Sequence, residues 1–328
     1  MKNILVTGGA GYIGSHACKA LKKAGYNPVA FDNLSRGFEE SVKYGPLVKG
    51  DITSASDLKK MFEKYDFYAV MHFAGLAYVG ESVQEPEKYW TNNVVGSVCL
   101  LNQCVESKVS KFIFSSTCSM YGDSAGELIN EDTPVNPLNP YAQTKYVIEQ
   151  VIANYSKAYG IKACSLRYFN VAGSDPEVEI GESHDPETHL IPNVIKAALT
   201  DSEVFVYGND FSTPDGTCVR DYIHVTDLVE AHLKALILLE KNSSENVNVL
   251  NLGTGKGYSV MEIVKQVEKI TSKKIKYKIV DRRDGDGAYL VSDNAKAKKV
   301  LDWEPLFSDL SSQIETAFIW HEKLSRTS

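Results

Sequence analysis

The sequence predicts an α/β protein in which a doubly wound parallel sheet is joined to a smaller, mixed α/β domain. Three observations predict this. Short apolar runs alternate with helix-like segments over the first half of the chain, a glycine-rich turn follows the first run, and the alternation breaks down after about residue 170. The length of 328 residues is sufficient for two domains.

The elements of the first half follow from their periodicity. Short apolar runs bounded by turn residues predict buried strands, and apolar residues three and four apart predict helices on the faces of the sheet. The predicted strands are residues 4–6, 29–31, 69–71, 112–114 and 163–166, and the predicted helices between them include 56–65, 87–105 and 141–158.

The second half is less regular. Pro176, Pro186, Pro192 and Pro214 interrupt it, which predicts a loop-rich region. Residues 220–225, a helix through 239 and residues 249–252 have α/β character again. We therefore predict two domains, 1–170 and 171–328, with about 220–255 returning to the first.

Composition excludes several classes of protein. Lysine and arginine number 35 against 42 aspartates and glutamates, and the net charge of −7 gives no general reason to expect a nucleic acid or an anionic membrane as partner. No apolar run approaches the roughly 20 residues of a membrane span. The six cysteines are scattered without a Cys-x-x-Cys pair, so we expect no disulfide framework, no metal centre and a cytoplasmic location.

Three glycines follow the first predicted strand and open a helix: Gly8, Gly11 and Gly14. Glycine permits a tight turn and lets backbone N–H groups at a helix N-terminus approach a pyrophosphate. Asp32 ends the second strand, where a carboxylate accepts hydrogen bonds from ribose hydroxyls and repels a 2′-phosphate. The combination predicts a Rossmann dinucleotide site for NAD, with Arg36 leaving some room for NADP.

A candidate catalytic group consists of Tyr141, Lys145 and Thr117. Tyr141 and Lys145 lie four residues apart after Asn139 and Pro140, which suit the cap and first turn of a helix, so the two side chains share one face. A tyrosine with its ordinary pKa of about 10 becomes a base at neutral pH only if a nearby cation stabilises the phenolate. Thr117 follows a strand end, where it can reach the reacting oxygen.

These motifs, together with several others, resemble the extended short-chain dehydrogenase/reductases and, within them, the UDP-glucose 4-epimerase family. The resemblance runs from Thr7 to about Trp303. The further motifs are His72-Phe73-Ala74-Gly75, Val79-Gly80-Glu81-Ser82, Asn92-Asn93-Val94, Leu166-Arg167-Tyr168-Phe169-Asn170, Gly216 to Val225 and Arg282-Arg283-Asp284-Gly285-Asp286.

The resemblance implies an NAD-binding domain at 1–170, a mainly UDP-sugar-binding domain at 171–328, and a homodimer formed through the helices at 87–105 and 141–158. It implies C4 epimerisation of a UDP-hexose, UDP-glucose or UDP-galactose, through a 4-keto intermediate. Tyr141 would act as the base, Thr117 would share the proton, and Lys145 would bind the nicotinamide ribose and tune the tyrosine.

The resemblance also implies the binding residues. Around NAD it places, besides the three glycines and the catalytic group, Tyr12, Ile13, Asp32, Asn33, Leu34, Ser35, Arg36, Gly37, Asp51, Ile52, Phe73, Ala74, Gly75, Leu76, Ala77, Asn93 and Phe169. Around the UDP-sugar it places, besides Thr117 and Tyr141, the residues Phe169, Asn170, His189, Leu190, Tyr207, Arg220, Arg283, Asp286 and Leu290. Where this chain has Ala77, the family can carry a lysine, so one contact of that kind is missing. On the residues alone, Arg220 and Arg283 could equally form surface ion pairs with Asp221 and Asp284.

Alternative functions remain at this level. Sugar-nucleotide dehydratases carry an acid pair directly after the threonine, and decarboxylases a glutamate one position further, whereas this chain has Cys118 and Ser119. A UDP-xylose/UDP-arabinose 4-epimerase fits the same motifs. A catalytically silent NAD-binding protein is disfavoured by the intact catalytic group.

Overall fold

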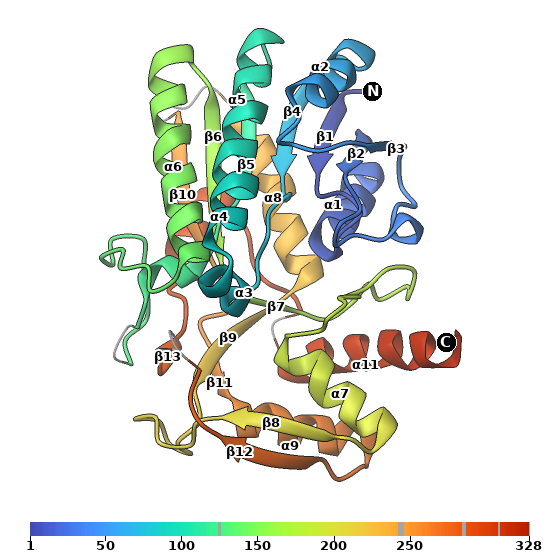
Figure 1. Ribbon diagram of the computed structural model, residues 1–328, viewed down its shortest axis with the longest axis vertical. Coiled ribbons are helices and arrows are strands. Elements are labelled where there is room, and N and C mark those ends of the chain that lie inside the picture. The colour runs from blue at the N-terminus through green and yellow to red at the C-terminus, as the bar shows by residue number, and fades with distance from the viewer. Residues whose placement is uncertain (124–125, 242–245, 284–286, 308, 328) are drawn as a thin grey trace.

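The computed structural model describes residues 1–123, 126–241, 246–283, 287–307 and 309–327. Its largest element is a parallel sheet in the order β10-β6-β5-β4-β1-β2-β3 (Figure 1). The strands are β1 (Asn3–Thr7), β2 (Asn27–Asp32), β3 (Leu47–Lys49), β4 (Phe67–His72), β5 (Lys111–Ser115), β6 (Lys162–Tyr168) and β10 (Val247–Leu252). The predicted doubly wound parallel sheet is confirmed.

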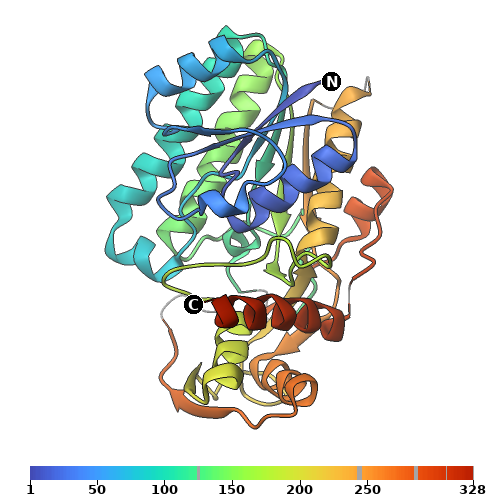
Figure 2. The ribbon, with the colours of Figure 1, turned by 90° about the vertical axis from the view of Figure 1, so that its right-hand side faces the viewer.

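Helices cover both faces of this sheet (Figures 1 and 2). One face carries α1 (Tyr12–Lys23), α8 (Val225–Glu240) and α10 (Ala295–Leu301), and the other carries α2 (Ala55–Lys64), α5 (Gly96–Glu106) and α6 (Pro140–Tyr159). Alternate side chains of a strand point to opposite faces, so Ile4 and Val6 join the first core and Leu5 joins the second. None of the helices formed by the described residues combines the length and apolar character that crossing a membrane would need.

The segment between β4 and α5 is more finely divided than predicted. It contains α3 (Val79–Gln84), α4 (Pro86–Tyr89) and a π-helical stretch, Trp90–Val95, before α5 begins. A π turn adds a residue to the helix and turns the side chains that follow it, and such turns are frequent at functional sites. Here the turn contains Asn93, which is buried.

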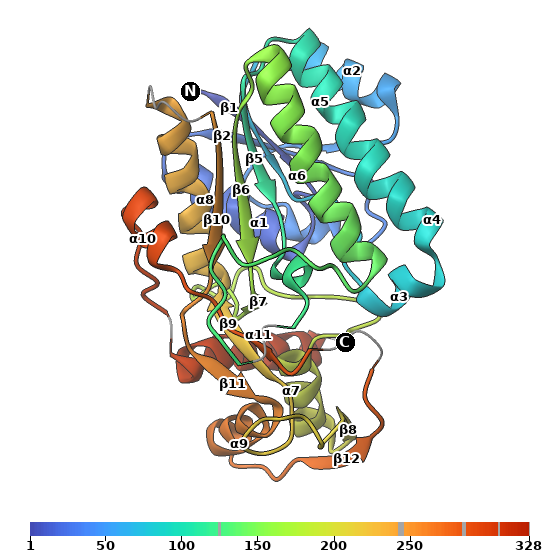
Figure 3. The same ribbon diagram turned by 90° about the vertical axis from the view of Figure 1, so that its left-hand side faces the viewer.

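The smaller domain is built around β9 (Val219–His224), which pairs with β7 (Asn170–Ala172), β11 (Gly257–Ser259) and β13 (Tyr289–Leu290). A separate pair is formed by β8 (Glu203–Tyr207) and β12 (Lys276–Val280). The helices are α7 (Leu190–Thr200), α9 (Val260–Thr271) and α11 (Leu310–Thr327), which share a third core (Figure 3). The chain thus crosses between the two parts more than once: α8, β10 and α10 lie with the large sheet, while β9, which directly precedes α8 in the sequence, lies in the small one.

The loop that follows β7 is fastened to α1. Lys19 of α1 is buried and forms ion pairs with Asp175 at 2.6 Å, Glu177 at 2.9 Å and Glu179 at 2.7 Å. The hydroxyl of Tyr12, at the start of the same helix, donates a hydrogen bond to the carbonyl of Gly173. The loop is therefore held against the helix that follows the glycine-rich turn.

Candidate functional site

A cavity of about 390 Å³ lies at the carboxyl ends of the parallel strands, the edge at which open α/β sheets bind their ligands. The predicted residues that line it are Gly8, Gly11, Tyr12, Ile13, Gly14, Asp32, Asn33, Ser35, Arg36, Gly37, Ile52, Phe73, Ala74, Gly75, Leu76, Ala77, Thr117, Tyr141, Lys145, Phe169, Asn170 and His189. The structure thus brings together most of the residues predicted for the cofactor.

The three glycines have different tasks. A Cβ on Gly8, whose φ is +69°, would lie 2.7 Å from the Ala74 nitrogen, and one on Gly14 would lie 2.1 Å from the Gly8 oxygen, so both are needed for close packing. At Gly11 a Cβ would meet only the Gly8 oxygen, at 3.3 Å. Gly11 is also the N-cap of α1, which has no side-chain cap bond and no acidic residue in its first turn. The helix N-terminus is therefore open to an anion, and this cradle fits the pyrophosphate of a dinucleotide.

Asp32 is fixed at the edge of the cavity. Its carboxylate accepts hydrogen bonds from the Ala10 nitrogen at 3.0 Å and the Leu34 nitrogen at 2.8 Å, while burial raises the pKa of the side chain. Arg36 is engaged elsewhere: it pairs with Glu81 at 2.8 Å and stacks over the ring of Tyr78. A carboxylate at the ribose position and an already paired arginine favour NAD over NADP.

Asn93 holds part of the cavity wall in place by bonding to its backbone. Its amide accepts a hydrogen bond from the Leu76 nitrogen at 2.8 Å and donates one to the Leu76 oxygen at 3.0 Å. Asn93 itself is absent from the lining, and Asn92 lines the cavity instead. The π-helical stretch therefore serves to hold the loop at residues 73–77, so Asn93 is a positioning residue in this arrangement.

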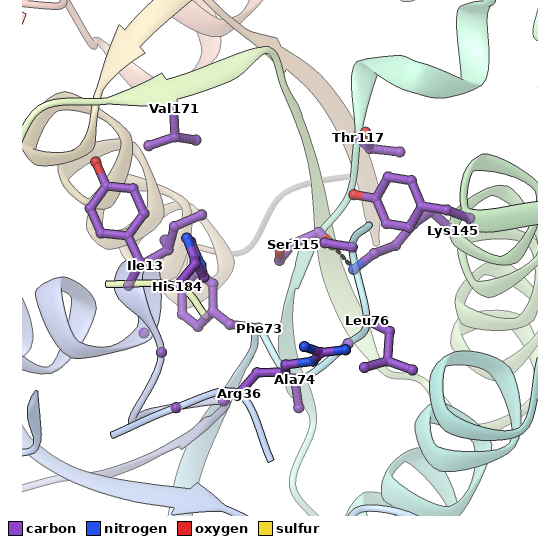
Figure 4. A pocket seen from close by; sticks show the side chains of 18 of the residues that line it. Ile13, Arg36, Phe73, Ala74, Leu76, Ser115, Thr117, Lys145, Val171 and His184 are labelled. Carbon is purple, nitrogen blue, oxygen red and sulfur yellow. Dashed lines mark hydrogen bonds between the residues drawn. The ribbon is translucent and has the colours of Figure 1, made fainter. Parts of the chain in front are cut away.

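The catalytic group meets within the cavity. Tyr141 and Lys145 lie in the first turns of α6, whose N-cap Asn139 accepts a hydrogen bond from the Ala142 nitrogen at 2.9 Å. Lys145 Nζ donates a hydrogen bond to the Ser115 carbonyl at 2.9 Å (Figure 4), and Thr117 follows the same strand, β5. The tyrosine, the lysine and the threonine thus come from one helix and one strand end.

Burial shifts both titratable groups towards their neutral forms. It raises the pKa of Tyr141 well above its ordinary value, and a hydrogen bond with Thr117 acts in the opposite direction. Burial lowers the pKa of Lys145 to about 8. Without a bound cofactor, Tyr141 therefore stays a protonated phenol. Positive charge brought near it stabilises the phenolate, and the side chain can then act as a base.

The lining includes residues that were not predicted to bind the cofactor or the substrate. Beyond the predicted set it contains Phe31, Gly50, Val79, Asn92, Ser115, Cys118, Ser119, Tyr168, Val171, Glu182 and His184. Tyr168 forms a hydrogen bond with the Ser115 hydroxyl, and burial raises its pKa to about 12. Tyr168 could have been identified from the sequence, because it belongs to the motif from Leu166 to Asn170.

Several predicted residues are not part of the cavity lining. Of the cofactor set these are Leu34, Asp51 and Asn93, and of the substrate set Leu190, Tyr207, Arg220, Arg283 and Leu290. Arg283 stacks over the ring of Tyr207 with 3.7 Å between its guanidinium carbon and the ring centre. Leu290 is buried in a small cluster with Cys118 and Phe169, both of which line the cavity. Asp284 and Asp286 lie outside the described residues.

Asp221, the alternative surface partner of Arg220, is fully buried. Its carboxylate accepts hydrogen bonds from the backbone nitrogens of Thr254, Gly255 and Ser292 at 2.9 to 3.1 Å. This carboxylate therefore holds the ends of neighbouring segments together inside the protein. Because this carboxylate is buried, the alternative of a surface ion pair between Asp221 and Arg220 does not hold.

Comparison with known proteins decides the family. The family model described as NAD dependent epimerase/dehydratase family matches residues 4–253. The chain belongs to this family. The range covers the glycine-rich turn, the catalytic group and the return of the chain to the large sheet, so the family's defining region coincides with the cavity-forming part of the protein.

Individual family members resemble nearly the whole chain. The UDP-glucose 4-epimerase of Rhizobium meliloti is 46% identical over 98% of this chain and 97% of its own length. A probable UDP-arabinose 4-epimerase of Arabidopsis thaliana is 43% identical over 98% of this chain and 81% of its own.

Solved structures of family members agree with the fold. The UDP-glucose 4-epimerase of Brucella ovis in complex with NAD has a TM-score of 0.93 at 46% identity, covering 97% of this chain and 98% of that one. The Bifidobacterium longum enzyme in complex with NAD+ and UDP has a TM-score of 0.94 at 36% identity, covering both chains completely. The predicted resemblance to UDP-glucose 4-epimerases is confirmed, and with it the predicted class, an NAD-dependent epimerase.

Proposed function

We propose that the enzyme interconverts UDP-glucose and UDP-galactose by inverting C4 of the sugar through a 4-keto intermediate, with NAD as its cofactor. The observation that carries this proposal is the meeting of Tyr141, Thr117 and Lys145 in the cavity beside the dinucleotide cradle. The names of the full-length relatives support the UDP-hexose.

Each residue of the catalytic group has its own role in the proposed reaction. When bound, NAD supplies a positively charged ring that takes the hydride from C4 and returns it. Tyr141 takes the proton of the 4-hydroxyl and later gives it back, and Thr117 shares that proton through its hydrogen bond to the phenol. Lys145, fixed by the Ser115 carbonyl, adds positive charge that stabilises the phenolate. The keto sugar must turn over before it is reduced again, so it has to be held less firmly than the nucleotide.

The remaining predicted residues fit a nucleotide site in the smaller domain. We assign Tyr207, Arg220 and Arg283, together with His189, Leu190 and Asp286, to the uridine diphosphate, and Asn170 with Phe169 to the sugar. Guanidinium groups suit a diphosphate because they donate paired hydrogen bonds and keep their charge. On this assignment residues 1–170 hold NAD and residues 171–328 mainly hold the UDP-sugar.

The proposal is tested by incubating purified protein with UDP-galactose, without added cofactor, and following the sugar by NMR. UDP-glucose should form with NAD that the protein retains through purification, because the reaction regenerates this cofactor in every cycle. A parallel sample with UDP-xylose tests the pentose alternative: faster conversion of UDP-xylose would move the assignment to a pentose epimerase. No conversion in either sample, even with added NAD, would contradict the proposal.

Turnover should fall as the pH rises past about 8. Lys145 has a pKa of about 8 in the buried site, so it is charged below that pH and loses its proton above it. The neutral amine no longer stabilises the Tyr141 phenolate. Measurement of kcat/KM from about pH 6 to about pH 10 should show this decline.

The variant Lys145→Arg checks the origin of the decline, because a guanidinium stays protonated throughout this range. Its activity is expected to be lower at every pH, since the longer side chain cannot keep the same contact with Ser115. Its profile should nevertheless lack the alkaline fall. An unchanged alkaline fall in this variant would show that another group titrates.

The resemblance to the family implies that Leu290 stands at the position that limits the room for an N-acetyl group on the sugar. It packs against Phe169 and Cys118, so shortening it makes room next to the cavity lining. The variant Leu290→Ser should gain turnover of UDP-N-acetylglucosamine relative to UDP-glucose, measured as the ratio of the two kcat/KM values. An unchanged ratio would remove this role from Leu290.

We also propose that the enzyme is a cytoplasmic homodimer. The six cysteines are all unpaired thiols, which is typical of a reducing compartment. The region where α5 and α6 lie exposes Val95 and Trp90, which are 50% and 37% exposed. Light scattering after gel filtration should give twice the 36.3 kDa of the chain, and the variant Val95→Asp should weaken the dimer.

A further inference from the structure

A cluster of two histidines and two glutamates borders the cavity, on the loop between β7 and α7. Glu182, His184, Glu187 and His189 each offer one nitrogen or oxygen atom, and these four atoms all lie within 4.8 Å of one another. Glu182 is only 3% exposed. All four residues come from the short segment 182–189, so a single piece of chain supplies the group.

The spacing of these atoms is that of a metal coordination shell. Nδ1 of His184 lies 3.2 Å from Glu182 Oε1 and 3.6 Å from Glu187 Oε2. Nδ1 of His189 lies 2.9 Å from the nearest oxygen of each glutamate. Ligand atoms bound tetrahedrally to Zn²⁺ at about 2.0–2.2 Å are about 3.4 Å from each other. The cluster therefore needs only small shifts to surround one ion.

One buried nitrogen of the cluster has no hydrogen-bond partner among the described residues. The buried Nδ1 atom of His184 makes no hydrogen bond, although it lies 3.2 Å from a carboxylate oxygen, because its direction is wrong for one. Glu187, by contrast, is oriented by the backbone nitrogens of Thr188 and His189, each 2.8 Å from its Oε1. An outer layer of bonds that orients ligands is typical of metal sites.

A nearby acidic group provides a comparison. Asp175, Glu177 and Glu179 also gather on this loop, but they surround the ammonium of Lys19, which already supplies their positive charge. Within the described part of the chain, Glu182 and Glu187 form ion pairs with the two histidines alone. Without an ion the two histidines supply the balancing positive charge: burial lowers their pKa, but the glutamates raise the pKa of His184 to about 9 and that of His189 to about 10. A bound divalent cation would displace these protons and balance the two carboxylates in their place.

We propose that Glu182, His184, Glu187 and His189 bind one divalent cation of the zinc class. Mixed imidazole and carboxylate donors suit Zn²⁺ and its transition-metal neighbours, whereas Ca²⁺ and Mg²⁺ prefer oxygen ligands alone. The sequence analysis predicted no metal centre because it weighed only the cysteines.

With four protein ligands the ion has a structural task. The ring of His184 packs edge-on against Tyr12, which lines the cavity, and against Tyr78, over which Arg36 stacks. The ion would hold the segment 182–189, and with it His189, beside the glycine-rich turn. This inference does not depend on the proposed substrate or reaction.

The test is the metal content of protein prepared without a histidine tag, exposed to zinc and then dialysed. Mass spectrometry of the metal should find about one zinc per chain in the wild type. His184→Gln and Glu187→Gln should each weaken zinc binding at least about 10-fold, measured by competition with a coloured chelator. Glu177→Gln removes a carboxylate from the neighbouring Lys19 group and should keep the zinc. Circular dichroism and thermal unfolding confirm that each variant is folded.

Cobalt gives a readout on the unaltered protein. Co²⁺ bound in place of zinc should show the intense visible absorption of a tetrahedral site, without any substitution. A wild type that retains no zinc and does not compete with the chelator would overturn the proposal, as would a folded His184→Gln variant that binds zinc as tightly as the wild type. The weak absorption of octahedral cobalt would refute the four-ligand geometry.

Discussion

Replacing Tyr141 with phenylalanine is expected to lower kcat by roughly 10²–10⁴-fold, the usual contribution of a general acid–base group. The ring keeps its volume in the buried site, so packing at the start of α6 is preserved, while the hydroxyl that exchanges the proton with the sugar is lost. Turnover of UDP-galactose would be measured together with the binding of NAD and UDP, which should stay near the wild-type values.

The matched control is Tyr146→Phe. Tyr146 lies on the same helix, is partly buried and does not line the cavity. This variant loses the same atom outside the site and should retain its activity. If Tyr141→Phe kept turnover within about 10-fold of the wild type, the assignment of the base would be wrong.

The second large effect is expected on stability. Glu149 and Arg167 are both buried, and their side chains meet in three hydrogen bonds: Nη2 to Oε2 at 2.6 Å, Nε to Oε1 at 3.0 Å and Nε to Oε2 at 3.2 Å. Ser116, the neighbour of Thr117, donates a hydrogen bond to the same carboxylate. Glu149→Leu leaves the Arg167 charge buried without its partner and should lower the free energy of unfolding by about 3–5 kcal/mol.

The double variant Glu149→Leu, Arg167→Met separates the lost charge pair from lost packing. It removes both charges and puts apolar side chains in their place, which is often close to neutral. Chemical denaturation should therefore find the double variant more stable than Glu149→Leu alone. If the double variant were the less stable of the two, the unpaired charge would not be the cause.

Local patterns were sufficient for the sheet and for the cofactor side of the site. Strands covered on both faces are continuous apolar runs, and Asn139 with Pro140 marks the start of α6. The carboxyl ends of parallel strands meet at one edge, so a glycine turn after β1, an aspartate ending β2 and a threonine after β5 had to converge.

Other elements lacked such a pattern. The strand β3 has three residues, none of them buried. The strand β8 alternates between exposed and buried residues over only five positions, and its partner β12 has no buried residue, so neither pattern is long enough to distinguish a strand from a loop. Glu182 and His184 lie in an irregular stretch, and they reach the cavity through long-range contacts of Tyr12 and Lys19. No local periodicity reports contacts of that kind.

The fastening of α1 to the loop after β7 has a consequence for how the enzyme responds to its surroundings. Lys19 holds three carboxylates of that loop, so the loop stays against the helix whose N-terminus faces the pyrophosphate cradle. We expect this fastening to slow the exchange of a bound cofactor with the medium, and an epimerisation that restores its oxidant in every cycle does not require exchange. The rate should then be insensitive to the ratio of oxidised to reduced nicotinamide nucleotides in solution, and sugar interconversion would continue whatever the redox balance of the cell.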